Sequence, residues 1–125
     1  MAKTSDRMDE VQPLLPLTPA LFHVLLALAD GEKHGYAILK EVERATDSKV
    51  QLSTGTLYGI IKRLLEAGMI EQPGKRPSAR NDDPRRRYYR LTAFGRQVAM
   101  AEAERMEEVL FMARAKRLLR GAQPA

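Results

Sequence analysis

The C-terminal part of the chain gives the strongest constraint on its fold. Residues 93–120 contain no proline and a single glycine, and Thr92 is a suitable N-cap just before them. We therefore predict one long helix from residue 93 to about residue 120. Small and apolar residues recur along it at alternating spacings of four and three, a pattern typical of a seam that packs against another helix. The seam consists of Ala99, Ala103, Met106, Leu110 and Ala113.

This seam has two candidate partners. It could fold back on its own domain, or it could pair with the same helix of a second molecule. We favour the second interpretation and predict that the seam is a homodimer interface. Its small residues and methionine are suited to close, adaptable packing.

Three shorter helices are expected before the long one, over residues 19–30, 34–46 and 54–67. Thr18 and Ser53 are suitable N-caps, and Gly31 and Gly68 are suitable C-terminal stops. The first helix should be buried on most sides, because its apolar residues cover nearly every direction. These residues are Leu21, Phe22, Val24, Leu25, Leu26 and Leu28.

The second helix should turn one face towards the core. We expect the inward residues to be Tyr36, Leu39 and Val42, with Ala45 or Ile38. Tyr36 is expected to be a core aromatic whose hydroxyl reaches the surface, and so is Tyr89.

A short extended link, residues 50–52, precedes the third helix, and a β-hairpin follows it. Residues 69–71 are expected to form a strand, residues 73–84 a polar loop, and residues 86–91 the returning strand. The expected fold is mainly α with a small β-hairpin. We divide the chain into a flexible arm (1–16), a central domain (17–92), and a C-terminal helix with its tail (93–125).

Length and composition limit the functional classes. With 125 residues the chain fits one domain, and a net charge of +5 makes a polyanion the natural partner. The chain has no cysteine and only two histidines, His23 and His34, so no standard metal site is expected. His34 is expected to be a turn or cap residue. The longest apolar run, residues 21–29, is too short to span a bilayer, and we expect a cytoplasmic protein without a cofactor.

No arrangement typical of catalysis is visible. The sequence lacks a glycine-rich phosphate loop, a nucleophile elbow and a pair of carboxylates in a catalytic pattern. We therefore expect a protein that is not an enzyme.

The third helix has one apolar face and an opposite face whose residues are unsuited to a hydrophobic core. Gly55, Gly59 and Lys62 lie opposite its apolar residues. Each glycine lowers helix stability by about 1 kcal/mol relative to alanine, so a structural role does not explain them. They would let the helix backbone come close to a partner. The hydroxyl groups of its first turn and its free N–H groups suit phosphates and base edges. The alternative is an ordinary solvated helix in which the glycines have no function.

The expected hairpin is strongly basic. Residues 74–90 contain seven basic residues against Asp82 and Asp83. Such a run could merely aid solubility, but its position directly after the third helix favours contact with DNA phosphates or the minor groove. The basic residues are Lys75, Arg76, Arg80, Arg85, Arg86, Arg87 and Arg90.

Several segments together resemble the PadR family of transcriptional regulators. They are His34-Gly35-Tyr36-Ala37-Ile38, Gly55-Thr56-Leu57-Tyr58, Arg63-Leu64 with Gly68-Met69-Ile70, and Arg86-Arg87-Tyr88-Tyr89-Arg90-Leu91-Thr92 with Gly95. The resemblance covers about residues 17–95 and implies a winged helix-turn-helix fold, repression, and dimers formed through the C-terminal helix. It also implies that Thr56, Tyr58 and Lys62 touch DNA and that arginines of the wing hold the flanking backbone.

A single C-terminal helix is similar to that of the smaller branch of the family, which includes multidrug-responsive regulators. The chain has no tryptophan, which departs from the aromatic-stacking effector pocket of those relatives. A small-molecule effector could still bind at the dimer interface. Such a pocket would be lined by Phe22, Met106, Leu110 or Phe111.

The sequence thus predicts a homodimeric repressor that binds double-stranded DNA at a palindromic operator with half-sites about 34 Å apart. The competing interpretation is a winged-helix module for protein–protein interaction without specific DNA binding. The predicted DNA-binding residues are Ser53, Thr54, Gly55, Thr56, Tyr58, Gly59, Lys62, Arg63, Lys75, Arg76, Arg80, Arg85, Arg86 and Arg87.

Overall fold

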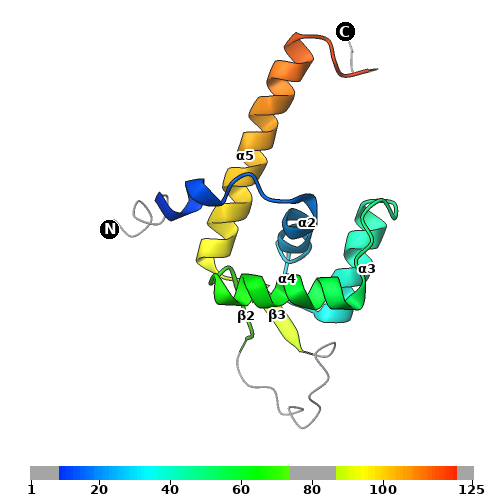
Figure 1. The fold of residues 1–125 in the computed structure, drawn as a ribbon, viewed down its shortest axis with the longest axis vertical. Helices are drawn as coiled ribbons and strands as arrows, with labels where there is room; N and C mark the ends of the chain where they lie inside the picture. Colours follow the sequence, from blue (N-terminus) through cyan, green and yellow to red (C-terminus); the bar gives the residue numbers. More distant parts are fainter. Residues whose placement is uncertain (1–8, 74–86, 121–125) are drawn as a thin grey trace.

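The computed structural model describes residues 9–73 and 87–120, in which three helices surround a core and a fourth projects from it (Figure 1). The elements are the 3-10 helix η1 (Gln12–Leu14), α2 (Pro19–Ala27), β1 (Lys33–His34), α3 (Gly35–Ala45), α4 (Thr54–Glu66), β2 (Ile70–Glu71), β3 (Tyr88–Leu91) and α5 (Ala93–Ala115). The predicted fold class, mainly α with a small β component, is confirmed.

Cap residues place the helix starts where the sequence predicts them. The Thr18 hydroxyl accepts a hydrogen bond from the Leu21 N–H at 3.1 Å, and the Thr92 hydroxyl accepts one from the Gly95 N–H at 3.0 Å. Each bond satisfies a backbone donor that the first helical turn leaves without a partner. Helix ends are less accurate: α2 ends at Ala27 rather than residue 30, and α5 at Ala115 rather than residue 120.

Helix α2 forms the centre of the core, as predicted, but one side of it is exposed to solvent. Val24 and Leu25 are completely buried, whereas Leu26 is 46% exposed. The expectation of burial on nearly all sides is therefore wrong for Leu26. The neighbouring elements contact only part of the circumference of this short helix.

Helix α3 faces the core through Ile38 and Val42, which are 0% and 1% exposed. The prediction of a core position is wrong for Tyr36, which is 50% exposed, and Ala45 is also exposed. Tyr89 is buried as expected, at 2% exposure, and this burial raises the pKa of its hydroxyl more than Arg87 lowers it.

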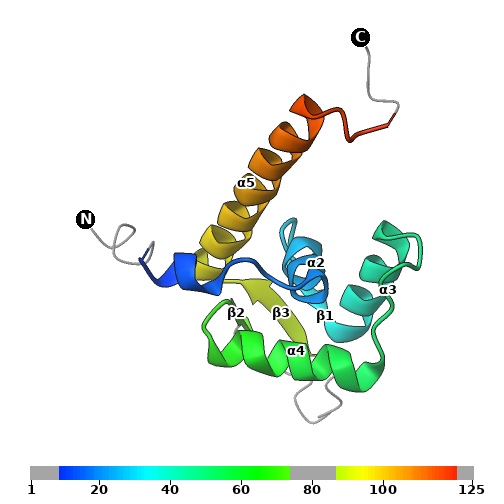
Figure 2. The same cartoon turned by 45° about the horizontal axis from the view of Figure 1, so that its top comes forward.

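The β component has one strand more than the predicted hairpin. Strand β3 pairs antiparallel with β2 on one side and with β1 on the other, in the order β1-β3-β2. The register sets His34 opposite Tyr88 and Ile70 opposite Leu91. Strand β1 has two residues, too few to show an alternating pattern in the sequence, and it exists through its pairing with β3. Figure 2 shows this sheet behind α4, with the start of α3 beside it.

The segment before α2 packs against the first half of α5. Val11 is completely buried in the core cluster, so this end of the predicted arm contacts the domain. Glu102 of α5 is 1% exposed, so this charged residue is buried. Its carboxylate accepts hydrogen bonds from Arg105 at 2.8 and 2.9 Å, and a further backbone hydrogen bond comes from Leu17.

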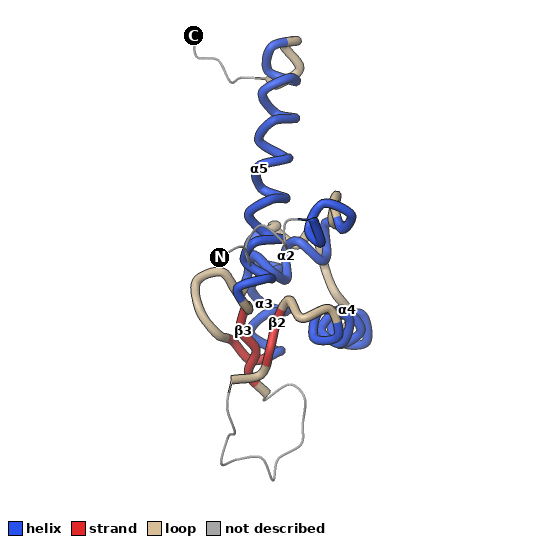
Figure 3. Tube along the Cα trace, turned by 90° about the vertical axis from the view of Figure 1, so that its left-hand side faces the viewer, coloured by secondary structure: helices blue, strands red, loops and turns tan. Residues whose placement is uncertain are grey.

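Beyond Glu102, α5 leaves the core and projects away from it (Figures 1 and 3). Large apolar side chains on this part remain exposed. They include Met106 (37%), Val109 (46%), Leu110 (45%), Phe111 (72%) and Met112 (55%). Within the described residues, no helix is both long enough and apolar enough to cross a membrane.

Candidate nucleic-acid interface

The outer face of α4 and its N-cap carry seven of the fourteen residues that the sequence assigns to DNA. Its inner face is buried through Leu57, Ile60, Ile61 and Leu64. The predicted residues on its outer face and at its N-cap are all exposed. They are Ser53, Thr54, Gly55, Thr56, Gly59, Lys62 and Arg63.

The two glycines on this face have open space around them. A Cβ atom at Gly55 or Gly59 would meet no atom of the chain within 4 Å. Packing inside the described structure therefore does not require glycine at either position. Glycine is also unfavourable in a helix interior, so neither packing nor helix propensity in the described chain accounts for it.

The N-terminal turn of α4 has an ordered set of hydroxyl groups. The Ser53 hydroxyl accepts a hydrogen bond from the Thr56 N–H at 3.1 Å and donates one to Thr56 Oγ1 at 2.9 Å. The Thr56 oxygen thus accepts a hydrogen bond, and its own proton remains available for another acceptor. An exposed hydroxyl donor at the positive end of a helix suits a phosphate oxygen or a base acceptor.

Tyr58 differs from the other predicted residues of α4. It is half-buried, and its hydroxyl oxygen is inaccessible to solvent. A Cβ atom at Gly35 would collide with this hydroxyl, so the tyrosine fills the junction between α3 and α4. The hydroxyl therefore does not reach the outer face, and only the ring of Tyr58 is left for a contact with DNA.

The predicted wing follows the β2–β3 ladder. Lys75, Arg76, Arg80, Arg85 and Arg86 lie outside the described residues. Arg87 is exposed directly before β3. Arg90, also part of the basic run, forms an exposed ion pair with Glu71 across the strands at 2.8 Å. Figure 3 shows β2 and β3 beside one another, with α4 to their right in this view.

The predicted dimer seam begins at Ala99, which packs against the core cluster, and then continues along the exposed part of α5. Ala99 and Ala113 are half-exposed, and Ala103, Met106 and Leu110 are exposed. Beyond Glu102, the segment before α2 approaches α5 near Arg105 and Glu108, which are not seam residues. The four residues suggested for an effector pocket are not brought together, because Phe22 is 9% exposed in α2 while the other three lie far along α5.

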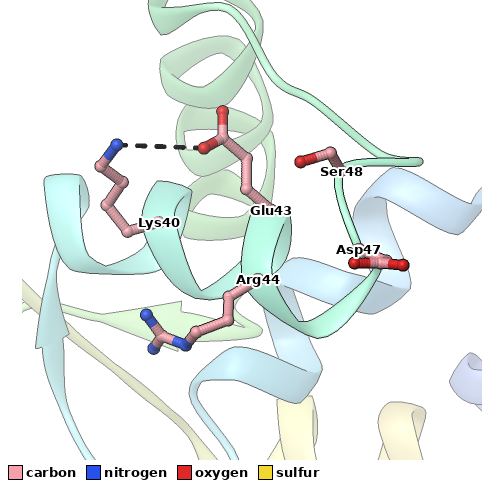
Figure 4. A pocket seen from close by; sticks show the side chains of 5 residues that line it. All are labelled: Lys40, Glu43, Arg44, Asp47 and Ser48. Atoms are coloured by element: carbon pink, nitrogen blue, oxygen red, sulfur yellow. Dashed lines mark ion pairs between the residues drawn. The ribbon is translucent and has the colours of Figure 1, made fainter.

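Two open surface pockets occur elsewhere among the described residues. One, of about 370 Å³, lies between the segment before α2 and α5, with Gln12, Leu15 and Arg105 in its lining. The other, of about 380 Å³, lies at the end of α3 (Figure 4). Its lining residues are Lys40, Glu43, Arg44, Asp47 and Ser48. No cluster of three or more His, Asp or Glu residues in the described chain could hold a metal ion.

Two features of the structure are not evident from the sequence. One is the pair of Tyr36 and Lys40 on α3, in which the Lys40 ammonium lies 5.5 Å from the centre of the Tyr36 ring. The spacing of four residues between Tyr36 and Lys40 is a signal for such a pair, although the apolar pattern of α3 favours a core position for Tyr36. The other is the buried Glu102 with its partly exposed partner Arg105, and no sequence rule predicts burial for a glutamate on a charged helix.

Known proteins resemble this chain in sequence and in fold. The family of PadR-like transcriptional regulators matches residues 24–101, more than half of the chain. A 37.1 kDa protein in transposon TN4556 of Streptomyces fradiae is 39% identical over 83 residues. These residues are 66% of this chain and 21% of that protein, so the chain spans about a fifth of the relative's length.

Solved structures share the fold at lower identity. A transcriptional regulator from Clostridium thermocellum superimposes with a TM-score of 0.61 at 24% identity, over 86% of this chain and 96% of that one. A PadR-like transcriptional regulator from Bacillus cereus gives a TM-score of 0.61 at 21% identity, over 90% of this chain and 98% of that one.

Proposed function

Because the chain belongs to the family of PadR-like transcriptional regulators, we propose that it is a sequence-specific DNA-binding repressor that acts as a homodimer on a palindromic operator. The observation that carries this proposal is the outer face of α4. It is exposed, it bears Thr56 and Lys62, and its two glycines have no packing role within the described chain.

Helix α4 enters the major groove in this proposal, since the groove has the width of one α-helix. The Thr56 hydroxyl donates to a base acceptor, and Lys62 and Arg63 bind phosphates. Gly55 and Gly59 let the helix backbone approach the duplex closely. The basic residues from Lys75 to Arg87 hold the flanking phosphates as a wing.

The homodimer is supported by the exposed seam of α5. Met106 and Leu110 are 37% and 45% exposed on a helix that projects from the core. Burying them against a second copy would gain about 25 cal/mol for each Å² of apolar surface removed from water. In this arrangement residues 17–92 bind DNA and residues 93–125 hold two such domains at a fixed separation, as a palindromic site requires.

An effector could act through the same interface. In the dimer, Met106, Leu110 and Phe111 would line apolar space between the two copies, and a small molecule bound there would change the separation of the recognition helices. Phe22 is buried in α2 and is not part of this proposed pocket. Addition of an effector would then release the DNA.

A binding assay with the DNA upstream of the protein's own gene tests the proposal. With six to eight phosphate contacts, log affinity should fall against log salt with a slope of about −5 to −7. Lys62→Ala and Arg86→Ala should weaken binding to every duplex, whereas Thr56→Ala should change the preference among operator variants. In a transcription assay from the adjacent promoter, the protein should lower transcript yield.

The alternative, a protein-interaction module, predicts different results. It requires no preference for the upstream DNA over a scrambled duplex of the same composition. Equal losses on all operator variants for Lys62→Ala, Arg86→Ala and Thr56→Ala would contradict the assignment of roles. Absence of binding at low salt would contradict the proposed function.

A further inference from the structure

An aromatic ring and a lysine lie together on the outer side of α3. Tyr36 is 50% exposed, and the Lys40 ammonium lies 5.5 Å from the centre of its ring. The two residues are four positions apart and therefore share one side of the helix. The opposite side faces the core through Ile38 and Val42. Neither side chain of the pair contributes to the core of the domain.

The first turn of α3 lies between the two elements that are proposed to bind DNA. On one side, Gly35 contacts the Tyr58 hydroxyl of α4. On the other side, His34 pairs with Tyr88 in the sheet, and Arg87, the residue before Tyr88, is exposed at the base of the wing. Tyr36 follows directly after this junction. Figure 2 shows the start of α3 beside both α4 and β1.

We propose that Tyr36 and Lys40 form a phosphate-binding site on α3, which holds the DNA backbone at the edge of the groove that α4 enters. This inference rests on the proposed function. The ligand is a phosphodiester oxygen, to which the Tyr36 hydroxyl donates a hydrogen bond and the Lys40 ammonium contributes charge. Tyrosine and lysine are both common donors to DNA phosphates.

The surroundings of Lys40 allow this contact. Its ammonium lies 4.0 Å from a Glu43 carboxylate oxygen, and the side chains of Lys40 and Glu43 are 51% and 31% exposed (Figure 4). An exposed pair at this distance is weak, so exchanging the carboxylate for a phosphate costs little. The attraction between the ammonium and the Tyr36 ring restricts the lysine to the side of α3 where the tyrosine lies.

Two substitutions remove the proposed contacts separately. Tyr36→Phe deletes one hydroxyl and keeps the ring, and it should weaken binding to the upstream duplex and to a scrambled duplex alike, by about fivefold to tenfold. Lys40→Gln should weaken binding to both duplexes and reduce the salt slope by about 0.9 per subunit, or about 1.8 for a dimer. Glu43→Gln, which frees the lysine, should strengthen binding by up to about fivefold.

Lys116→Gln, the same loss of charge at the end of α5, is the matched control and should change affinity little. Thermal unfolding of each variant checks that the fold is intact. If Lys62→Ala weakens binding while Tyr36→Phe and Lys40→Gln behave like the control, the site on α3 is refuted and the proposed function stands. If the unaltered protein binds neither duplex at low salt, both are refuted.

Discussion

The Tyr58 hydroxyl occupies the space that a Cβ atom at residue 35 would need. This contact joins the first turn of α3 to α4, and it explains why glycine follows His34 at this point of the chain. His34 itself caps α3, since its Nδ1 accepts a hydrogen bond from the Ala37 N–H at 3.1 Å, as expected of a cap residue. Two of the motifs that carry the family resemblance thus meet in one packing contact.

Gly35→Ala should destabilise the protein by about 1–3 kcal/mol, because the new methyl group forces Tyr58 or the helix to move. Chemical denaturation measures this loss. Combining it with Tyr58→Phe should recover part of the stability, because the hydroxyl is the closest obstacle. Purely additive losses in the double variant would show that the two residues are not coupled.

The Ser53 cap should serve both stability and recognition. Ser53→Ala removes the bond to the Thr56 N–H and should cost about 1 kcal/mol of unfolding free energy. It also removes the donor that orients Thr56 Oγ1, so the preference among operator variants should weaken. Thr18→Ala removes an equivalent cap from α2 and is the matched control. It should lower stability by a similar amount and leave DNA preference unchanged.

The glycines of α4 predict opposite changes in stability and affinity. Gly55→Ala and Gly59→Ala should each stabilise the folded protein by about 1 kcal/mol, because alanine favours the helix and the new methyl group meets nothing. Each should also weaken DNA binding, because the methyl group keeps the backbone away from the duplex. Thermal unfolding and a binding titration on the same samples measure both effects. Unchanged affinity would assign the glycines no role in recognition.

Local sequence signals predict those parts of the fold that depend on interactions between residues close together in the chain. Caps such as Thr18, Ser53 and Thr92 fix helix starts through bonds to residues three positions away. The positive φ of 77° at Gly68 likewise marks the end of α4. The exposed face of α4 follows from its helical periodicity, so most of the candidate site in the described chain could be located without coordinates.

The predictions from sequence fail where contacts between residues far apart in the chain determine the structure. Strand β1 exists through its pairing with β3, more than fifty residues away. Tyr36 is apolar enough for the core, but it lies on the side of α3 opposite Ile38 and Val42 and is 50% exposed. Glu102 is buried because Arg105 and the backbone near Leu17 satisfy its carboxylate, and no pattern in the sequence reveals that arrangement.

The ion pair of Glu102 predicts a pH dependence of stability. Hydrogen bonds from Arg105 hold the pKa of the Glu102 carboxyl below its ordinary value, against the opposing effect of burial. The unfolded chain therefore takes up a proton first as the pH falls. The stabilisation is complete above the ordinary glutamate pKa, about 4.3, and is lost as the pH falls through the lower pKa of the folded state.

Denaturation of the protein and of Glu102→Gln at several pH values tests this dependence. The variant should be less stable at pH 7, and the difference should shrink progressively in acid. Arg105→Gln should show the same trend, because it removes the other half of the pair. A difference between the two proteins that stays constant from pH 7 to pH 3 would contradict the assignment.

The α5 seam predicts where a single charge disrupts the dimer. Leu110→Lys places an ammonium group in the proposed interface, where it would be buried without a partner, and the dimer should dissociate. Met112 is similarly exposed, at 55% against 45% for Leu110, but lies about 160° away around the helix. Met112→Lys is therefore the control and should remain dimeric in sedimentation experiments.

Loss of the dimer should also change DNA binding in a defined way. Monomeric Leu110→Lys should bind a single half-site as well as the unaltered protein does, and should lose the additional affinity for two half-sites about 34 Å apart. The Met112→Lys control should keep that additional affinity. Dissociation by Met112→Lys but not by Leu110→Lys would place the interface on the other side of α5, and a monomeric unaltered protein would refute the seam altogether.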